Sequence, residues 1–219
     1  MNKIIAFTNQ KGGVGKSTIC RLMASYLASK GERVCVIDTD SQQTLVLQRK
    51  DDIEFLGEEV MPYTIQSYKI NTYELMEQLM ENAKAFDGYV LIDCPPSLDA
   101  DGLIPILTKS DCLVCPFRYD TTTLTSTGNY IRVLRSLFDR LKQPLTPIYF
   151  IPNNIVRKGS VEEKKVWHEV AKAFSILGIL LPSIPGRAVI EKVNTYEITS
   201  QQRELVSDIF ETIIKDLKV

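Results

Sequence analysis

Short, continuous runs of apolar residues recur along the whole chain and are separated by longer amphipathic stretches. The apolar positions within each run are consecutive rather than alternating, which is typical of strands buried on both faces of a parallel sheet. The runs are residues 4–8, 34–37, 89–92, 113–117, 148–151 and 179–181. This pattern predicts a mostly parallel sheet.

The stretches between these runs carry apolar residues at the spacing of amphipathic helices. The first stripe consists of Ile19, Leu22, Met23, Tyr26 and Leu27. Further stripes lie within residues 75–83, 131–141, 166–177 and 205–217. A repeated strand–helix–strand order needs right-handed crossovers, so we expect these stripes to cover both faces of the sheet. We interpret residues 1–219 as a single domain.

The stretch from residue 41 to residue 71 has the weakest pattern. We expect a short helix there, followed by an edge strand near residues 63–66. An edge strand tolerates polar residues because one of its sides stays open to solvent.

The composition narrows the possible functions. The 219 residues include 26 Lys and Arg against 27 Asp and Glu, a net charge of -1, which excludes nucleic-acid binding through bulk charge but not through a local patch. No run approaches the length of a membrane helix, and the first apolar run is too short for a signal peptide. Five cysteines are a sparse and odd count, which argues against a disulfide framework and favours a reducing cytoplasm. The single histidine, His168, argues against a histidine metal site and against a serine–histidine triad.

Cys112 and Cys115 have the spacing of a metal-binding pair. Residues three apart on a strand point to opposite faces, however, so we predict that both are core residues.

The strongest chemical signal is the segment of residues 11–18, which reads KGGVGKST between the first predicted strand and the first predicted helix. Glycines let backbone N–H groups point at phosphate oxygens, and the helix N-terminus adds partial positive charge. We expect Lys16 to neutralise the β- and γ-phosphates and the Ser17 hydroxyl to bind Mg²⁺. The predicted nucleotide-binding residues of this segment are Gly12, Gly13, Val14, Gly15, Lys16, Ser17 and Thr18.

This loop departs from the ordinary phosphate-loop pattern, because Gln10 stands where a glycine is usual and Lys11 is an added cation. The glycine turn of a dinucleotide-binding domain is a weaker interpretation, since it fits the spacing poorly and leaves both lysines unexplained. The predicted fold class is therefore an α/β P-loop NTPase, with a mostly parallel twisted sheet and helices on both faces.

With this loop, the chain resembles the ParA/MinD family of deviant Walker ATPases, and within it the small ParA-like partition members without an N-terminal helix-turn-helix. Asp38, Asp40 and Gln42 match the family's D-x-D-x-Q element, although Ser41 stands where many members have proline. The resemblance implies that Asp38 acts near Mg²⁺ and that Asp40 helps to activate the attacking water. Asp93 ends an apolar strand before a Pro-Pro pair and looks like a Walker B carboxylate for Mg²⁺.

The resemblance also implies a role for Lys11. In the family this lysine reaches the nucleotide of a second subunit, where a cation stabilises the developing phosphate charge. We therefore expect Lys11 and Asp40 to be catalytic, in a dimer that forms around two ATP molecules. The expected cofactors are ATP and Mg²⁺, and we expect slow intrinsic hydrolysis.

The adenine site has a thinner signal. Family members often place an amide side chain after a late strand, and Asn153 or Asn154 occupies that place here. Residues 182–187 are expected to cover the base from the other side.

DNA binding leaves two interpretations open. The candidate residues are Arg132, Arg135, Arg157, Lys158, Arg187 and Lys192. Acidic residues dilute each group, so a solvated helix face explains them equally well.

The resemblance leads to one main function and one alternative. The main function is plasmid or chromosome partition, by a cytoplasmic, nucleoid-associated homodimer that binds duplex DNA non-specifically. A ParB-like centromere-binding protein or another activator would stimulate hydrolysis and release the dimer. The alternative is a MinD-like spatial regulator that positions a cargo other than DNA. The last stripe lies in a segment, residues 203–219, without a basic excess, so we expect no membrane attachment.

Overall fold

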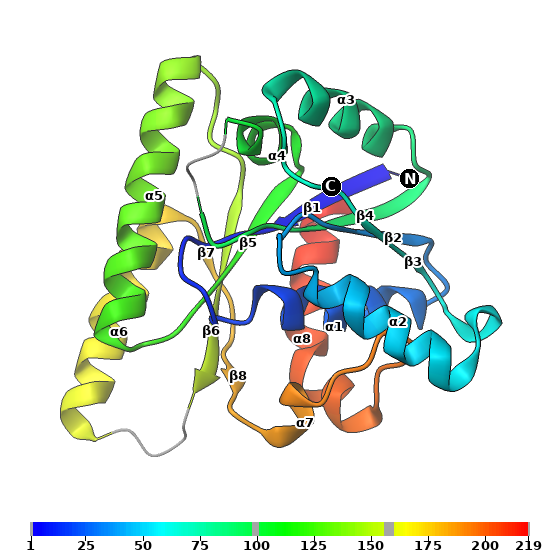
Figure 1. Cartoon of the computed structure of the whole chain (residues 1–219). Helices are drawn as coiled ribbons and strands as arrows, with labels where there is room; N and C mark the ends of the chain where they lie inside the picture. Colours follow the sequence, from blue (N-terminus) through cyan, green and yellow to red (C-terminus); the bar gives the residue numbers. More distant parts are fainter. Residues whose placement is uncertain (1, 98–100, 156–159, 219) are drawn as a thin grey trace.

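The computed structural model describes residues 2–97, 101–155 and 160–218. Its parallel sheet has the strand order β3-β2-β4-β1-β5-β6-β7, and β8 also pairs with β6 (Figure 1). The strands are β1 (Asn2–Phe7), β2 (Val34–Asp38), β3 (Thr64–Ser67), β4 (Gly88–Asp93), β5 (Cys112–Phe117), β6 (Ile148–Ile155), β7 (Ile179–Leu180) and β8 (Ile184–Pro185). All six predicted apolar runs are strands, and the predicted edge strand is β3.

Helices cover both faces of this sheet, as the sequence pattern predicts. They are α1 (Lys16–Ala28), α2 (Thr44–Leu56), α3 (Tyr73–Lys84), α4 (Leu103–Lys109), α5 (Thr121–Leu141), α6 (Val161–Leu177), α7 (Ala188–Glu191) and α8 (Ser200–Lys218), with a short 3-10 turn at Glu58–Val60. One core cluster joins α1 and α8 to the sheet, and the other joins α3, α4 and α5 to its opposite face. The predicted α/β P-loop architecture is confirmed.

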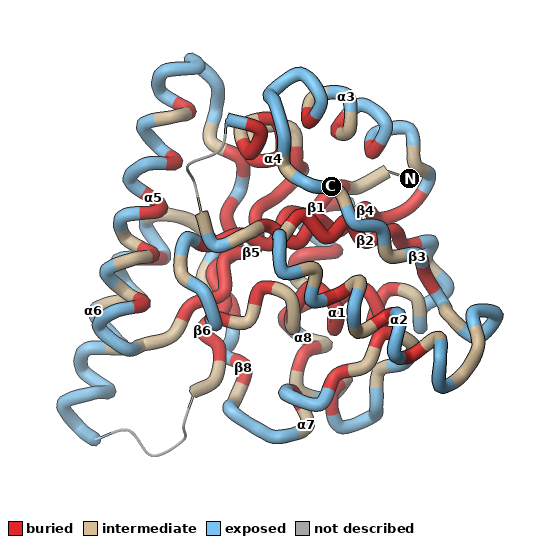
Figure 2. The backbone as a smooth tube through the Cα atoms, in the orientation of Figure 1, coloured by how far each residue is buried: buried red, intermediate tan, exposed pale blue. Residues whose placement is uncertain are grey.

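Alternate residues of each central strand enter opposite clusters. In β1, Ile5 and Phe7 pack toward α1 and α8, whereas Ile4 and Ala6 pack toward α3 and α4. All four are almost completely buried, and the central strands are the most continuously buried part of the chain in Figure 2. Burial on both faces explains why these strands read as continuous apolar runs.

The cysteine prediction is also confirmed. Cys112 belongs to the cluster on one face of the sheet and Cys115 to the cluster on the other. All five cysteines are buried and free. Across the described ranges, no group of three or more histidine, cysteine or acidic side chains is arranged to hold a metal.

The apolar stripe of residues 166–177 is only partly a core stripe. Of the predicted stripe residues, Phe174 is buried and Val170 and Leu177 are partly buried against the core, while Val166 is 53% exposed. The expectation that the whole stripe faces the sheet is therefore wrong, because α6 flanks the short strand β7 at the end of the sheet (Figure 1). A helix at that position has little sheet to cover.

Two helices are longer than the sequence pattern predicts, and some of the shortest helices and strands were not predicted. The short helix expected after residue 41 is the 13-residue α2, and α5 begins at Thr121, ten residues before its apolar stripe. The missed elements are α4, α7 and β8, which are too short to show a periodicity. None of the helices, in the part of the chain described, is both long and apolar enough to cross a bilayer.

Candidate nucleotide-binding site

The topology brings the three predicted motifs to one edge of the sheet. The strands β1, β4 and β2 are neighbours, and Asp93 is in register with Phe7 on one side and with Asp38 on the other. Parallel strands end at a common edge, where α/β proteins bind their ligands. The phosphate-loop segment follows β1, so it lies beside both aspartates.

Glycine shapes the loop itself. Gly13 and Gly15 have positive φ angles of 72° and 103°, which side chains disfavour. The helix α1 begins at Lys16, and its N-cap residue, Gly15, has no side chain that could accept hydrogen bonds from the first turn. The first N–H groups of α1 therefore stay available to an anion.

Asn153 holds this loop from the side. Its Nδ2 donates to the Val14 carbonyl at 2.7 Å, and its side chain is buried. A Cβ on Gly15 would lie 2.2 Å from the same nitrogen. Val14 is 1% exposed, so only its backbone could touch a phosphate.

Lys16 lies under the loop, and its Nζ donates to the Lys11 carbonyl at 3.4 Å. Burial lowers the pKa of Lys16, and the nearby Asp93 carboxylate opposes this shift. A buried ammonium at this place is suited to neutralise a phosphate chain.

Asp93 is the most unusual carboxylate of the site. It is 1% exposed, and neither oxygen has a hydrogen-bond partner among the described residues. Burial raises its pKa to about 7, while the neighbouring Ser17 hydroxyl and Lys16 ammonium pull the pKa down. A buried carboxylate beside a serine hydroxyl and a lysine ammonium fits the hydration shell of a Mg²⁺ ion. The predicted metal ligands Ser17 and Asp93 are thus brought together.

Asp38, the third predicted metal residue, is fully buried and is already engaged with the backbone. One oxygen accepts from the N–H groups of Leu45 and Val46 at 3.0 and 3.3 Å, and the other accepts from Asp40 at 3.2 Å. Burial raises the pKa of Asp38, and these N–H donors oppose the shift. Asp38 therefore holds the start of α2 beside the phosphate loop. Its predicted role near Mg²⁺ stays a prediction.

We expect Asp38→Ala to lower the free energy of unfolding by about 1–2 kcal/mol, because the first turn of α2 loses its acceptor. The measurement is urea unfolding without nucleotide. Asp38→Asn keeps one acceptor oxygen and should lose less stability. An unchanged midpoint in Asp38→Ala would contradict this role.

A cleft of about 390 Å³ opens between the phosphate loop and residues 185–191. The residues lining it that the sequence predicted are Gly12, Gly13, Gly15, Lys16, Ser17, Thr18, Asp40, Asn153 and Asn154. Pro185, Gly186 and Arg187 also line the cleft, and the cover of a base by residues 182–187 stays a prediction. Which of Asn153 and Asn154 meets a base stays a prediction.

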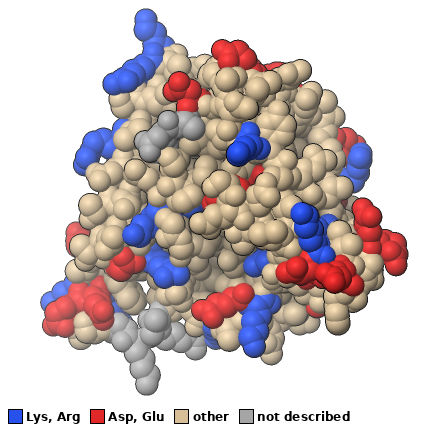
Figure 3. Space-filling view, viewed as in Figure 1, with Lys and Arg blue, Asp and Glu red and all other residues tan. Residues whose placement is uncertain are grey.

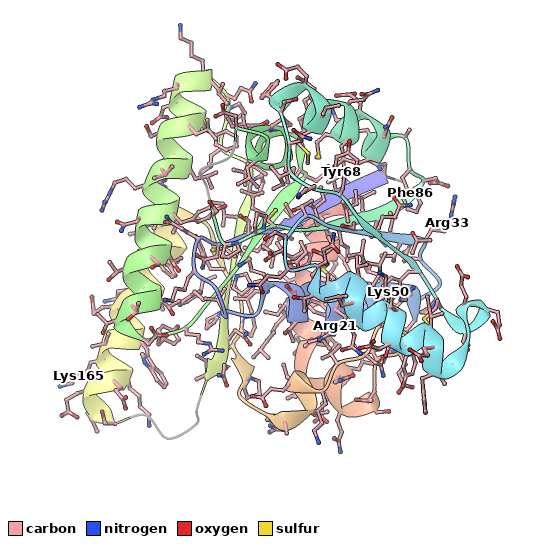
Figure 4. The ribbon with its side chains drawn as sticks, viewed as in Figure 1. Arg21, Arg33, Lys50, Tyr68, Phe86 and Lys165 are labelled. Atoms are coloured by element: carbon pink, nitrogen blue, oxygen red, sulfur yellow. The ribbon has the colours of Figure 1, made fainter. Side chains whose placement is uncertain are left out.

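The candidate DNA-binding residues are spread over separate elements. Arg132 and Arg135 lie on α5, Arg187 lines the cleft, and Lys192 follows α7. Arg157 and Lys158 lie outside the described residues. A further basic residue, Lys165, lies on α6 at the edge of the molecule (Figure 4). On the face shown in Figure 3, basic and acidic side chains are interspersed.

Sequence reasoning missed two polar residues near the loop. Asn9 is buried, and its Nδ2 donates to the Pro116 carbonyl at 2.8 Å and to the Thr127 hydroxyl at 2.9 Å. Arg118, just after β5, lines the cleft. The signal that could have found Arg118 is its position at the carboxyl end of the strand next to β1.

The fold and the site define a phosphate-loop nucleotide-binding domain. Residues 5–197 match the CobQ/CobB/MinD/ParA nucleotide binding domain family, and the chain belongs to this family.

Similar proteins agree with this assignment. The sporulation initiation inhibitor protein Soj of Bacillus subtilis is 30% identical over 179 residues, 66% of this chain and 70% of its own length. The maintenance of carboxysome distribution protein A of Halothiobacillus neapolitanus is 24% identical over 208 residues, 94% of this chain and 92% of its own.

Solved structures share the fold. A plasmid partition protein from Borrelia burgdorferi bound to AMPPNP superposes with a TM-score of 0.74 at 22% identity, covering 98% of this chain and 99% of that one. Other structures of this fold hold ADP or an ATP analogue with magnesium. The expected cofactors, ATP and Mg²⁺, are consistent with these ligands.

Proposed function

We propose that this chain is a Mg²⁺-dependent ATPase of the ParA type that acts in plasmid or chromosome partition. The observation that carries the ATPase proposal is the Asp93 carboxylate, which is buried beside Ser17 and the phosphate loop and has no hydrogen-bond partner of good geometry in the part of the chain described. When bound, Mg²⁺ would neutralise phosphate charge and orient the phosphates. Lys16 would hold the phosphate chain, and Asp40, in the wall of the cleft, would help to position water.

ATP would join two copies face to face, and the dimer would bind duplex DNA without sequence preference. A ParB-like centromere-binding protein or another activator would stimulate hydrolysis and release the dimer from the nucleoid. Membership of the family and the likeness to a plasmid partition protein support this role. No membrane partner is part of the proposal.

The deciding experiment measures ATP hydrolysis and molecular mass together, with and without duplex DNA. We expect a monomer without nucleotide, a dimer with a non-hydrolysable ATP analogue, and DNA binding only by the dimer. Because phosphate contacts release counterions, the affinity should fall steeply with salt. Absence of binding at low salt, by a protein that still dimerises with ATP, would remove DNA from the proposal.

That outcome would favour the second candidate, a spatial regulator that positions a cargo other than DNA. The similarity to a carboxysome distribution protein supports it. In both cases the ATP-driven dimer is the switch, so the loss of dimerisation would contradict both.

Lys11→Ala tests the proposed role of this lysine in trans. We expect ATP binding to be retained and hydrolysis to fall by roughly a hundredfold or more, because a cation supplied across the dimer stabilises the transferring phosphate. Binding is measured by calorimetry and hydrolysis by phosphate release. Lys50→Ala, on the exposed side of α2, is the matched control (Figure 4). Hydrolysis at the original rate in Lys11→Ala would exclude the role in trans.

A further inference from the structure

Arg118 occupies a fixed place beside the phosphate loop. It follows Phe117, the last residue of β5, and β5 pairs directly with β1. The Thr8 N–H donates to the Val114 carbonyl at 2.9 Å, and Asn9 donates to the Pro116 carbonyl. These bonds join the chain entering the loop to the chain leading to Arg118.

The neighbours of Arg118 direct its side chain away from α6. The Phe117 and Tyr119 rings contact each other edge to face at 5.3 Å, and Tyr119 stacks on Trp167 of α6 at 5.1 Å. Successive side chains of an extended segment point to opposite sides. Arg118 therefore lies on the side of the cleft, which it lines together with Gly12, Gly13 and Lys16.

Among the described residues, the guanidinium has neither a hydrogen-bond acceptor for its buried Nε nor a carboxylate within ion-pair distance. The nearest acid in sequence, Asp120, caps α5 by accepting from the N–H and the hydroxyl of Thr123. Burial raises the pKa of Asp120, but these bonds and the nearby charge of Arg118 lower it below its ordinary value, so Asp120 is a charged neighbour of Arg118 but makes no direct ion pair with it. A buried N–H without an acceptor is costly, so a ligand of the cleft is the natural partner.

We propose that Arg118 donates hydrogen bonds to the phosphate groups of the bound nucleotide, as a second cation of the site next to Lys16. A guanidinium presents several N–H donors in a plane and matches phosphate oxygens better than any other side chain. This inference rests on the nucleotide-binding function proposed above. It assigns part of the phosphate affinity to a residue outside the glycine-rich loop.

The test is calorimetric binding of Mg-ATP and of Mg-tripolyphosphate, which carries the phosphates without the nucleoside. Arg118→Met should weaken the binding of both ligands about tenfold or more, as expected for a charge-assisted hydrogen bond. Arg118→Lys should recover part of the loss. The control is Arg33→Met, which should bind both ligands like the original protein. Arg33 precedes β2, at the amino ends of the strands and therefore opposite the cleft, and it lies 5.2 Å from the Phe86 ring (Figure 4).

Three results would overturn the inference. One is unchanged affinity in Arg118→Met, and another is a loss confined to Mg-ATP, which would place the contact on the base or ribose. The third is a lower melting temperature at unchanged affinity, which would make Arg118 structural. If Arg118→Met does not fold, Arg118→Gln is measured in the same way. If the original protein binds neither ligand, the proposed function fails and this inference with it.

Discussion

Gly15→Ala is expected to destabilise the protein by about 2–5 kcal/mol and to weaken ATP binding roughly a hundredfold or more. Gly15 has a φ of 103°, which costs any residue with a Cβ, and its Cβ would lie 2.2 Å from Asn153 Nδ2. Relief of this clash would move either Asn153 or the loop, and both changes misdirect the N–H groups that should meet phosphate. Urea unfolding and calorimetry measure the two effects.

Gly13→Ala is the matched control for this prediction. Gly13 also has a positive φ, of 72°, but a Cβ there meets no atom of the described residues within 4 Å. Only the backbone cost of about 1–2 kcal/mol should appear. In the pair Gly15→Ala and Asn153→Ala, the double variant should lose less stability than the sum of the single losses, because the clash is then absent. Equal losses in Gly13→Ala and Gly15→Ala would contradict the role given to Asn153.

Asp93→Asn is expected to reduce Mg²⁺-dependent hydrolysis at least roughly a hundredfold, because the buried carboxylate beside Ser17 would no longer hold the metal's water. The same change should stabilise the protein at neutral pH when nucleotide and metal are absent, since it removes from the interior a charged group whose burial outweighs the support of Ser17 and Lys16. Phosphate release and urea unfolding at pH 8 measure the two effects. Full activity in Asp93→Asn would exclude the metal role.

The pH dependence of the stability follows from the direction of the Asp93 shift. The pKa is about 7 in the folded protein against an ordinary 3.8, because burial disfavours the charged form. Between these values the folded state binds more protons than the unfolded state, so stability falls as pH rises from about 4 to about 7. The difference in unfolding free energy between Asp93→Asn and the original protein should grow over this range and then level off. A difference that does not change with pH would contradict the shift.

Much of the fold could be predicted because its determinants are local. The six apolar runs became strands, and the glycine-rich segment lies between β1 and α1 as expected. The sequence pattern did not predict the burial of a helix where that burial depends on the length of the neighbouring strand. The apolar residues of α6 resemble those of α5, yet Val166 is half exposed because only the short β7 lies at that end of the sheet.

The sequence alone determined the phosphate loop and the order of the aspartates, since glycine freedom, helix N-termini and strand ends act over a few residues. Only the tertiary structure placed Asp93 opposite Asp38 and buried its carboxylate with no hydrogen-bond partner among the residues described. It also brought Asn153 and Arg118 to a loop that lies about a hundred residues or more away in the chain. These contacts arise from the order of the strands and from the removal of water around them. Neither the strand order nor the exclusion of water can be predicted from the residue spacing within a single segment.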